Sequence, residues 1–410
     1  MKKYLFIPSI ILLGFISCTE KVKDNKLKDG QWRGEFLVAE DQKAPFVFDV
    51  TNAETDSATV TLVNGAERVH LTGIKYSGDT VIIPIEAFDA QLVGVIKDGK
   101  LTGALKKIEK PDDPGILFDA VWGNVLRFDP VSITTTNSPI GKWDVQFVNE
   151  KGDTTNNVGI FELKNNILTG SILTNTGDLR YLEGNLTSDG FQLSAFSGSS
   201  PRLLTAVFEG TNDFVGKLYT VRGVTKLIGK RNPNAALADP FSLTQLKKGY
   251  NSLSFTFPNS KGKQISLSDP QYKGKVVIVS ILGSWCPNCL DELEFLVPWY
   301  NENKDRGVEI VGLAFEYKDS PEAVNATLDR LIKRYNIPYE VLYAGKPGDE
   351  STAKALPALD RVKSYPTTIF IDKKGVVRKI HTGFSGPATG LFYDDFKTEF
   401  NHLIDELLAE

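Results

Sequence analysis

Two cysteines three residues apart, Cys286 and Cys289, are the residues of this chain best suited to chemistry. That spacing lets one sulfur attack a foreign disulfide while the other resolves the mixed intermediate. An unbroken apolar run (276–282) precedes the pair, and residues with a helical pattern (290–296) follow it. At the start of a helix, unpaired backbone N–H groups and the helix dipole favour a thiolate. The sequence therefore predicts a redox-active dithiol that needs no bound cofactor.

Two other uses of the cysteine pair are open but weaker. A zinc site needs about four ligands, and the remaining Cys18 and the three histidines show no ligand spacing, so no metal is expected. A purely structural disulfide would close a very small loop and add little stability.

Length and charge limit the possible classes of protein. A chain of 410 residues is too long for one core, so we expect two or three domains. With 47 basic and 51 acidic residues, the formal net charge is −4, and no nucleic-acid partner is indicated.

The first residues predict export and a lipid anchor. After a basic start and an apolar run (5–16), the segment that ends in Cys18 resembles the lipobox of bacterial lipoproteins, although Phe15 stands where leucine is usual. We interpret residues 1–17 as a signal peptide cleaved before an acylated Cys18, and residues 18–29 as a solvated tether. A plain signal peptide with a spare cysteine is the alternative. Export would place Cys286 and Cys289 where disulfides persist.

Residues 30–232 have an all-β pattern of short alternating apolar runs separated by turn residues. Gly-x-Trp occurs at Trp32 and again at Trp143, 111 residues later, and further matches follow at the same offset. We interpret this as two copies of one antiparallel meander module, at residues 30–135 and 136–232. The modules are interpreted as a scaffold, with a partner- or ligand-binding face as the alternative.

After a linker (233–250), residues 251–410 alternate between strand and helix patterns and end in a hairpin and a helix. This order predicts an α/β sheet covered on both faces. The main strands are expected at 275–282, 308–315, 339–343, 367–372 and 376–381, and the helices at 286–303, 320–335, 356–362 and 391–408.

Residues 251–410 resemble the thioredoxin-fold, TlpA/ResA-like thiol-disulfide oxidoreductases of bacterial envelopes. The resemblance rests on the lead-in 273–277, on Trp285-Cys286-x-x-Cys289 and on Tyr365-Pro366-Thr-Thr. It implies that Pro366 follows a cis peptide bond and faces the cysteines, that Tyr365 offers its backbone to an extended substrate, and that Trp285 shields the pair.

The resemblance also assigns supporting residues. Glu292, one helical turn beyond Cys289, could move protons if burial raises its pKa. Ser280 stands where thioredoxin itself keeps a buried aspartate, which strengthens the case for Glu292; Glu316 is a weaker candidate. Pro287 and Asn288 lie between the cysteines and should tune the redox potential.

The resemblance implies an enzyme of the bacterial cell envelope that reduces disulfides in envelope proteins and receives electrons from a membrane thiol donor. Cys286, nearer the helix start, would attack the substrate and Cys289 would resolve the mixed disulfide. Disulfide oxidation or isomerisation is the nearest enzymatic alternative. A lipoprotein that binds a ligand through its β-modules is the alternative from another class.

Overall fold

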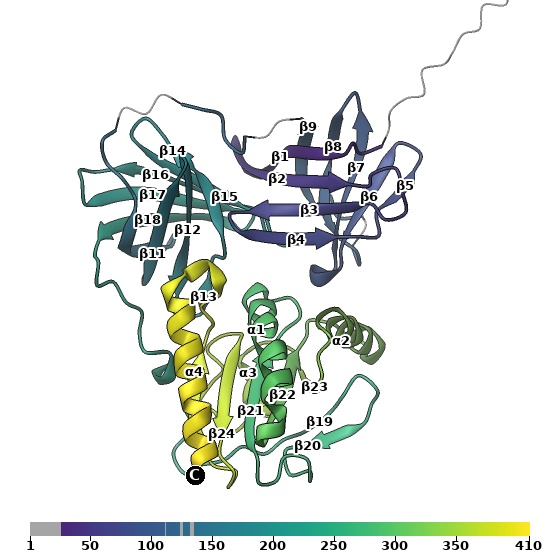
Figure 1. Cartoon of the computed structure of the whole chain (residues 1–410), viewed down its shortest axis with the longest axis vertical. Helices are drawn as coiled ribbons and strands as arrows, with labels where there is room; N and C mark the ends of the chain where they lie inside the picture. The colour runs from purple at the N-terminus through teal and green to yellow at the C-terminus, as the bar shows by residue number, and fades with distance from the viewer. Residues whose placement is uncertain (1–25, 111, 124–125, 132–134) are drawn as a thin grey trace, which may run out of the picture.

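The computed structural model contains two large antiparallel sheets and a smaller mixed sheet (Figure 1). The expected signal peptide (1–17), the expected lipid-attachment residue Cys18 and the tether up to residue 25 lie outside the described residues. The structure describes residues 26–110, 112–123, 126–131 and 135–410. Among these residues, no helix combines the length and apolar character needed to cross a membrane.

The first sheet (β1–β9) has nine strands in the order β4-β3-β2-β1-β9-β8-β7-β6-β5. Every second residue of strands such as β3 and β6 is buried, as expected for strands that place one face on a core. Trp32 and Phe36 of β1 lie fully buried in that core. The bounds are β1 Gly30–Ala39, β2 Gln42–Thr51, β3 Thr59–Asn64, β4 Glu67–Leu71, β5 Lys75–Ser77, β6 Thr80–Ile85, the 3₁₀ helix η1 Glu86–Phe88, β7 Ala90–Lys97, β8 Lys100–Lys107 and β9 Ile116–Trp122.

The second sheet (β10–β18) has the order β11-β10-β18-β17-β16-β15-β14-β12-β13. An additional pairing between β11 and β12 joins its two sides, so eight of its strands form a closed ring. In the first sheet, β4 and β5 are edge strands. The bounds are β10 Gly141–Val148, β11 Thr154–Lys164, β12 Ile167–Thr174, β13 Gly177–Asp178, β14 Leu182–Leu186, β15 Gly190–Ala195, β16 Arg202–Phe208, β17 Asp213–Thr220 and β18 Gly223–Arg231.

The two sheets share local geometry at positions 111 residues apart. The indole Nε1 of Trp32 donates to the backbone oxygen of Lys28 at 3.0 Å, and Nε1 of Trp143 donates to that of Pro139 at 2.7 Å. Each acceptor lies four residues before its tryptophan. Two copies of one module would share this contact, so it supports the duplication, which stays a prediction from sequence.

A buried amide joins the two sheets. Asn64, at the end of β3, is fully buried; its Nδ2 donates to the Phe196 oxygen at 2.9 Å and its Oδ1 accepts from the Phe196 N–H at 3.0 Å. The Phe196 ring in turn packs on Phe36 of the first sheet, with ring centroids 4.5 Å apart. The contact satisfies two backbone groups that have no access to water.

Replacing Asn64 with alanine is expected to lower the free energy of unfolding by about 2–4 kcal/mol, because two buried backbone groups lose their partners. Asn156→Ala, at an exposed position of β11, is the matched control and should change stability by less than about 0.5 kcal/mol. Urea unfolding of both variants measures the difference. Equal stabilities of the two variants would show that the amide contact does not hold the sheets together.

The C-terminal part has a five-stranded sheet in the order β23-β22-β21-β24-β25, in which β21, β22 and β23 are parallel and β24 and β25 run antiparallel to their neighbours. All seven residues of β21 are buried, in keeping with the apolar run at its centre. The bounds are η2 Pro240–Ser242, β19 Thr256–Pro258, β20 Gln264–Ser266, β21 Val276–Leu282, α1 Pro287–Asn303, η3 Lys304–Arg306, β22 Val308–Phe315, α2 Pro321–Tyr335, β23 Glu340–Gly345, α3 Asp349–Ala355, β24 Thr367–Ile371, β25 Val377–Thr382, η4 Pro387–Thr389 and α4 Leu391–Ala409.

Two apolar clusters lie on opposite faces of this sheet. Helices α1, α2 and α4 cover the face that carries Ile278, whereas the β19–β20 hairpin and the segment after α3 cover the face that carries Val279. The strand order and this layering confirm the predicted thioredoxin fold, and the two large sheets confirm the predicted all-β first half.

One element was predicted wrongly. The short helix expected at residues 356–362 lies earlier, as α3, and residues 356–362 are not helical. Pro357 disfavours a helical conformation at Leu356. The apolar side chains that suggested a helix are buried instead in an irregular segment, where Leu359 forms a β-bridge with Leu246 of the expected linker.

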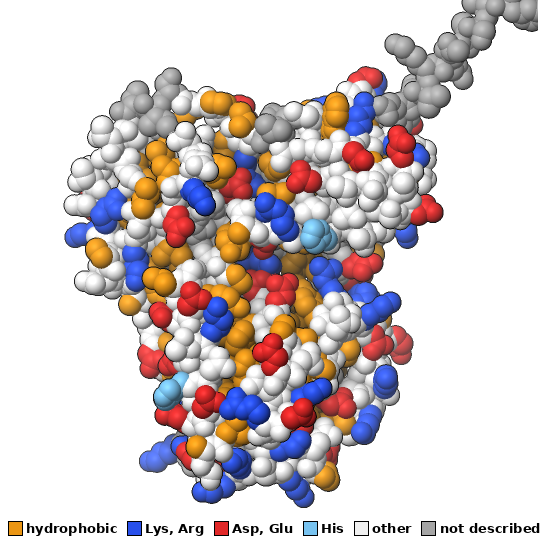
Figure 2. Space-filling model, viewed as in Figure 1, with side chains coloured by type: hydrophobic (Ala, Val, Ile, Leu, Met, Phe, Trp, Pro, Cys, Tyr) orange, Lys and Arg blue, Asp and Glu red, His pale blue; other side chains and the backbone are white. Residues whose placement is uncertain are grey.

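The two large sheets lie side by side over the end of the thioredoxin fold at which α1 begins (Figure 1). Charged side chains gather where the upper and lower parts meet (Figure 2). Arg180, which follows β13, binds both Asp291 of α1 at 2.9 Å and Glu67 of β4 at 2.6 Å. One largely buried guanidinium thus links both sheets to the helix that carries Cys289.

Candidate active site

The cysteine pair lies at the start of α1. Cys286 is the N-cap residue, and its sulfur accepts a hydrogen bond from the backbone N–H of Cys289 at 3.3 Å. Both residues are free thiols in the structure. The N–H group and the helix dipole stabilise negative charge on the Cys286 sulfur. Burial raises the pKa of Cys289 well above its ordinary value, and hydrogen bonding and charge at Cys286 raise it further.

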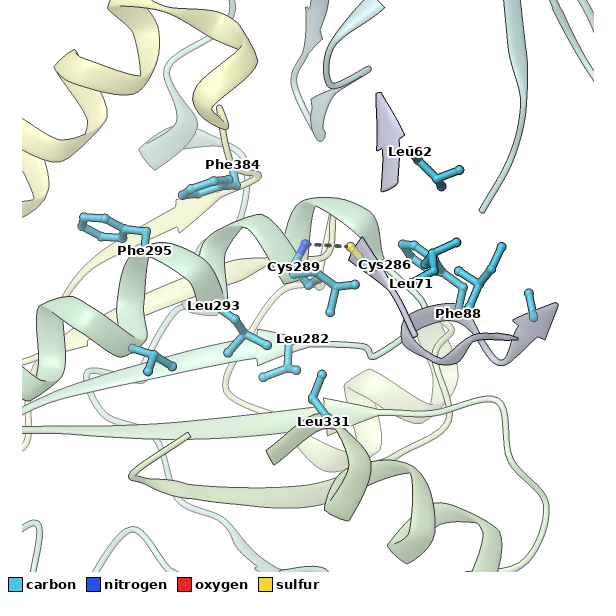
Figure 3. Close-up of a cluster of buried hydrophobic side chains, with 14 of the residues drawn as sticks. Leu62, Leu71, Phe88, Leu282, Cys286, Cys289, Leu293, Phe295, Leu331 and Phe384 are labelled. Carbon is cyan, nitrogen blue, oxygen red and sulfur yellow. Dashed lines mark hydrogen bonds between the residues drawn. The ribbon is translucent and has the colours of Figure 1, made fainter. Parts of the chain in front are cut away.

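The cysteine pair is buried, and it belongs to an apolar cluster that extends into the first sheet. Cys286 is 5% exposed and Cys289 is fully buried. Both belong to an apolar cluster that also contains Leu62, Leu71 and Phe88 (Figure 3). The close-up draws these three side chains of the first sheet in the same view as the two cysteines. The sulfurs therefore lie inside the folded chain rather than on its open surface.

A loop that ends at β24 faces the cysteines. The Tyr365–Pro366 peptide bond is cis, and the Cys286 thiol donates to the Tyr365 backbone oxygen at 3.3 Å. Trp285 packs edge-on against the Tyr365 ring, with centroids 5.3 Å apart, and its Nε1 donates to the Phe315 oxygen at 2.9 Å. The structure thus brings Trp285, Cys286 and the Tyr365–Pro366 loop together.

Glu292 lies buried one turn along α1. Its two carboxylate oxygens accept hydrogen bonds from Thr368 Oγ1 at 2.5 Å and from Ser280 Oγ at 2.8 Å. Burial raises the pKa of Glu292 to about 7, although both hydrogen bonds lower it. Its charge contributes to the raised pKa of Cys289. A carboxyl group that titrates near neutral pH is suited to proton transfer.

Glu316 follows β22 and supports the active-site loop. Its carboxylate accepts from both the backbone N–H and the hydroxyl of Ser284, each at 2.8 Å. Burial raises the pKa of Glu316 to about 7. Because Ser284 directly precedes Trp285, the contact positions the loop that leads into the cysteines.

Of the two residues between the cysteines, Pro287 is the first residue of α1, where a missing N–H costs nothing. Asn288 points away from the thioredoxin fold, and its Nδ2 donates to the Asp178 oxygen of the second sheet at 3.3 Å.

Sequence reasoning missed the residues that contact the site from the second sheet. Thr176 and Asp178 lie more than a hundred residues from the cysteines along the chain, and no motif links the two segments. It also missed Ser364, which directly precedes the Tyr365-Pro366 motif and donates to the Thr176 oxygen at 2.8 Å. Its place beside that motif was the one available signal.

Comparison with known proteins matches the same part of the chain. The model of the AhpC/TSA family matches residues 249–380. Thiol-disulfide oxidoreductase ResA of Bacillus subtilis is 32% identical over 150 residues, which are 37% of this chain and 74% of that protein. ResA of Halalkalibacterium halodurans is 28% identical over 139 residues, which are 33% of this chain and 69% of that protein.

A solved structure of a thioredoxin-family thiol:disulfide interchange protein from Chlorobium tepidum TLS covers 40% of this chain and 98% of its own, with 22% identity and a TM-score of 0.31. The residues matched by the AhpC/TSA model include the cysteine pair, the helix that carries Glu292 and most of the sheet around them. Through this thioredoxin-fold part, the chain belongs to the ResA-like family of thiol-disulfide oxidoreductases.

Proposed function

We propose that this protein is a lipid-anchored enzyme outside the cytoplasm that reduces disulfide bonds in proteins of the bacterial cell envelope. The observation that carries the proposal is the position of Cys286 at the N-cap of α1, where the Cys289 N–H points at its sulfur. The chemistry needs no bound cofactor, because the two thiols supply both electrons.

In the proposed reaction, the Cys286 thiolate attacks one sulfur of a substrate disulfide. The substrate S–S bond breaks, a mixed disulfide with Cys286 forms, and the released substrate sulfur takes up a proton. Cys289 then loses its proton and attacks the Cys286 sulfur, which releases the second substrate sulfur as a thiol. Two electrons have passed to the substrate, and Cys286 and Cys289 are left as a disulfide. A membrane thiol donor then supplies two further electrons that reduce this disulfide again.

Neighbouring residues have distinct proposed roles. The raised pKa of Cys289 keeps it protonated until the mixed disulfide forms, and Glu292, whose pKa is about 7, accepts its proton. Tyr365 and Pro366 dock the substrate backbone, and Trp285 shields the sulfurs. Pro287 and Asn288, between the cysteines, set the potential of the pair.

The proposed location rests on the N-terminal sequence. Acylation of Cys18 would hold the chain on a membrane, and the tether would let the folded part reach its substrates and the electron donor. Export would also place the Cys286–Cys289 pair in a compartment where protein disulfides, its proposed substrates, persist.

The reduction potential of the Cys286–Cys289 pair tests the direction of electron flow. We expect a value near or below about −250 mV, in the range of thioredoxin, when the protein is equilibrated in dithiothreitol buffers and its thiols are trapped. A value between about −120 and −180 mV would identify an oxidase or isomerase instead and would overturn the proposed direction.

A further inference from the structure

A turn of the second sheet lies against the cysteine pair. This turn, residues 175–178, follows β12 and includes β13, which Figure 1 places at the end of the sheet that faces the thioredoxin fold. The Thr176 oxygen accepts from Ser364 Oγ at 2.8 Å, and the Asp178 oxygen accepts from Asn288 Nδ2 at 3.3 Å. Ser364 directly precedes Tyr365, and Asn288 lies between the cysteines, so the turn is bound on both sides of Cys286.

The contact leaves no free space between the turn and the site. A Cβ atom on Gly177 would lie 2.7 Å from Cγ of Asn288. A Cβ atom on Gly383, which follows β25, would lie 3.1 Å from the carbonyl carbon of Thr176 and 3.2 Å from the oxygen of Asn175. Two glycines therefore allow the backbones to touch, and Cys286 is left 5% exposed.

Buried polar contacts hold the turn in place. The Asp178 carboxylate accepts from the Gly386 N–H at 2.8 Å. Two residues further on, Arg180 forms its ion pairs with Asp291 at 2.9 Å and with Glu67 at 2.6 Å. Such partnered groups are costly to separate without other partners, so this position of the turn is a defined state of the molecule.

We propose that residues 175–178 occupy the groove in which the substrate backbone binds, and that a protein disulfide reaches Cys286 only after this turn withdraws. The inference rests on the proposed function, because it concerns access to the same sulfurs. The donors Ser364 Oγ and Asn288 Nδ2 then bind two carbonyl groups of the substrate that are two residues apart. The groove then takes a substrate segment with a small residue between those two carbonyls, as Gly177 is in the turn.

The test is a substitution that prevents the turn from docking. Gly177→Tyr places a ring where even a Cβ meets Asn288. Gly223→Tyr is the matched control, because Gly223 lies in the same sheet with a φ of +135°, close to the +140° of Gly177, and its Cβ would meet only a Glu150 oxygen at 4.0 Å. Both substitutions carry similar backbone strain, but only the first displaces the turn.

Two measurements follow on the full-length chain. We expect Gly177→Tyr to reduce insulin disulfides at least about tenfold faster than the wild type, because the rate follows the fraction of molecules with an open groove. In chains whose other cysteines are replaced by serine, Cys286 of Gly177→Tyr should react with a bulky maleimide faster by a similar factor. Gly223→Tyr should match the wild type in both measurements.

Equal insulin and maleimide rates in the wild type and Gly177→Tyr would overturn the inference. Faster maleimide labelling without insulin reduction by any chain would support the occupied groove while refuting the proposed function. Arg180→Gln provides a second route if Gly177→Tyr does not fold, because it removes the ion pairs to Asp291 and Glu67 and should likewise speed both reactions.

Discussion

Replacing Cys286 with serine is expected to lower the rate of disulfide reduction by at least about a thousandfold, to the level of the reaction without protein. A serine hydroxyl does not form an anion at neutral pH that could attack a disulfide, even where the Cys289 N–H would stabilise it. Insulin reduction with dithiothreitol as electron donor measures the effect. Cys18→Ser is the control, since it removes a cysteine from the sequence without changing the pair.

The companion variant Cys289→Ser should behave differently. It keeps the attacking sulfur but removes the one that resolves the mixed disulfide, so a covalent complex with the substrate should accumulate. Electrophoresis without reductant would reveal this complex. If the Cys286→Ser protein keeps its activity, or if the mixed disulfide forms through Cys289, then Cys286 is not the attacking residue.

The second large effect is a pH-dependent stability difference caused by Glu292. Its pKa is about 7 in the folded protein and 4.5 when the side chain is exposed, so the folded state binds the proton more tightly. The protonated carboxyl therefore stabilises the fold by about 3 kcal/mol below pH 4.5, and this contribution is lost as the pH rises through 7. Glu292→Gln removes the titration while keeping a group that Thr368 and Ser280 can bond.

The stability of Glu292→Gln relative to the wild type should consequently increase by about 2–3 kcal/mol between pH 5 and pH 8. Urea unfolding at the two pH values measures this change. Glu302→Gln is the matched control, because Glu302 is exposed on the same helix. If both variants show the same pH dependence relative to the wild type, Glu292 is not the buried acid described above.

Elements with strong local signals could be predicted from the sequence. The helix α2 begins where Ser320 caps it, with its hydroxyl accepting from the Ala323 N–H at 3.2 Å, and Pro321 occupies the first turn, as the sequence indicated. The strand β22 has the predicted bounds because an apolar run of that length fits a buried parallel strand. In both cases, neighbouring residues carry the whole signal.

Features that depend on distant contacts could not be predicted. Closure of the second sheet needs pairing between β11 and β12 together with a return from β18 to β10, and the alternating pattern is the same in the sheet with free edges. Docking of residues 175–178 beside Asn288 joins segments more than a hundred residues apart. The sequence did not indicate that Arg180 links the two sheets to α1, since a single arginine after a turn has many possible partners.

The burial of the cysteine pair also affects how long the protein stays reduced. Oxygen, peroxide and stray thiols must reach a sulfur to oxidise it, and Cys286 and Cys289 are almost entirely buried in the folded chain. The covered molecule can therefore store two electrons between encounters, even where the surroundings would oxidise an open dithiol. The turn at residues 175–178 of the second sheet contributes to this cover through its contacts with Ser364 and Asn288.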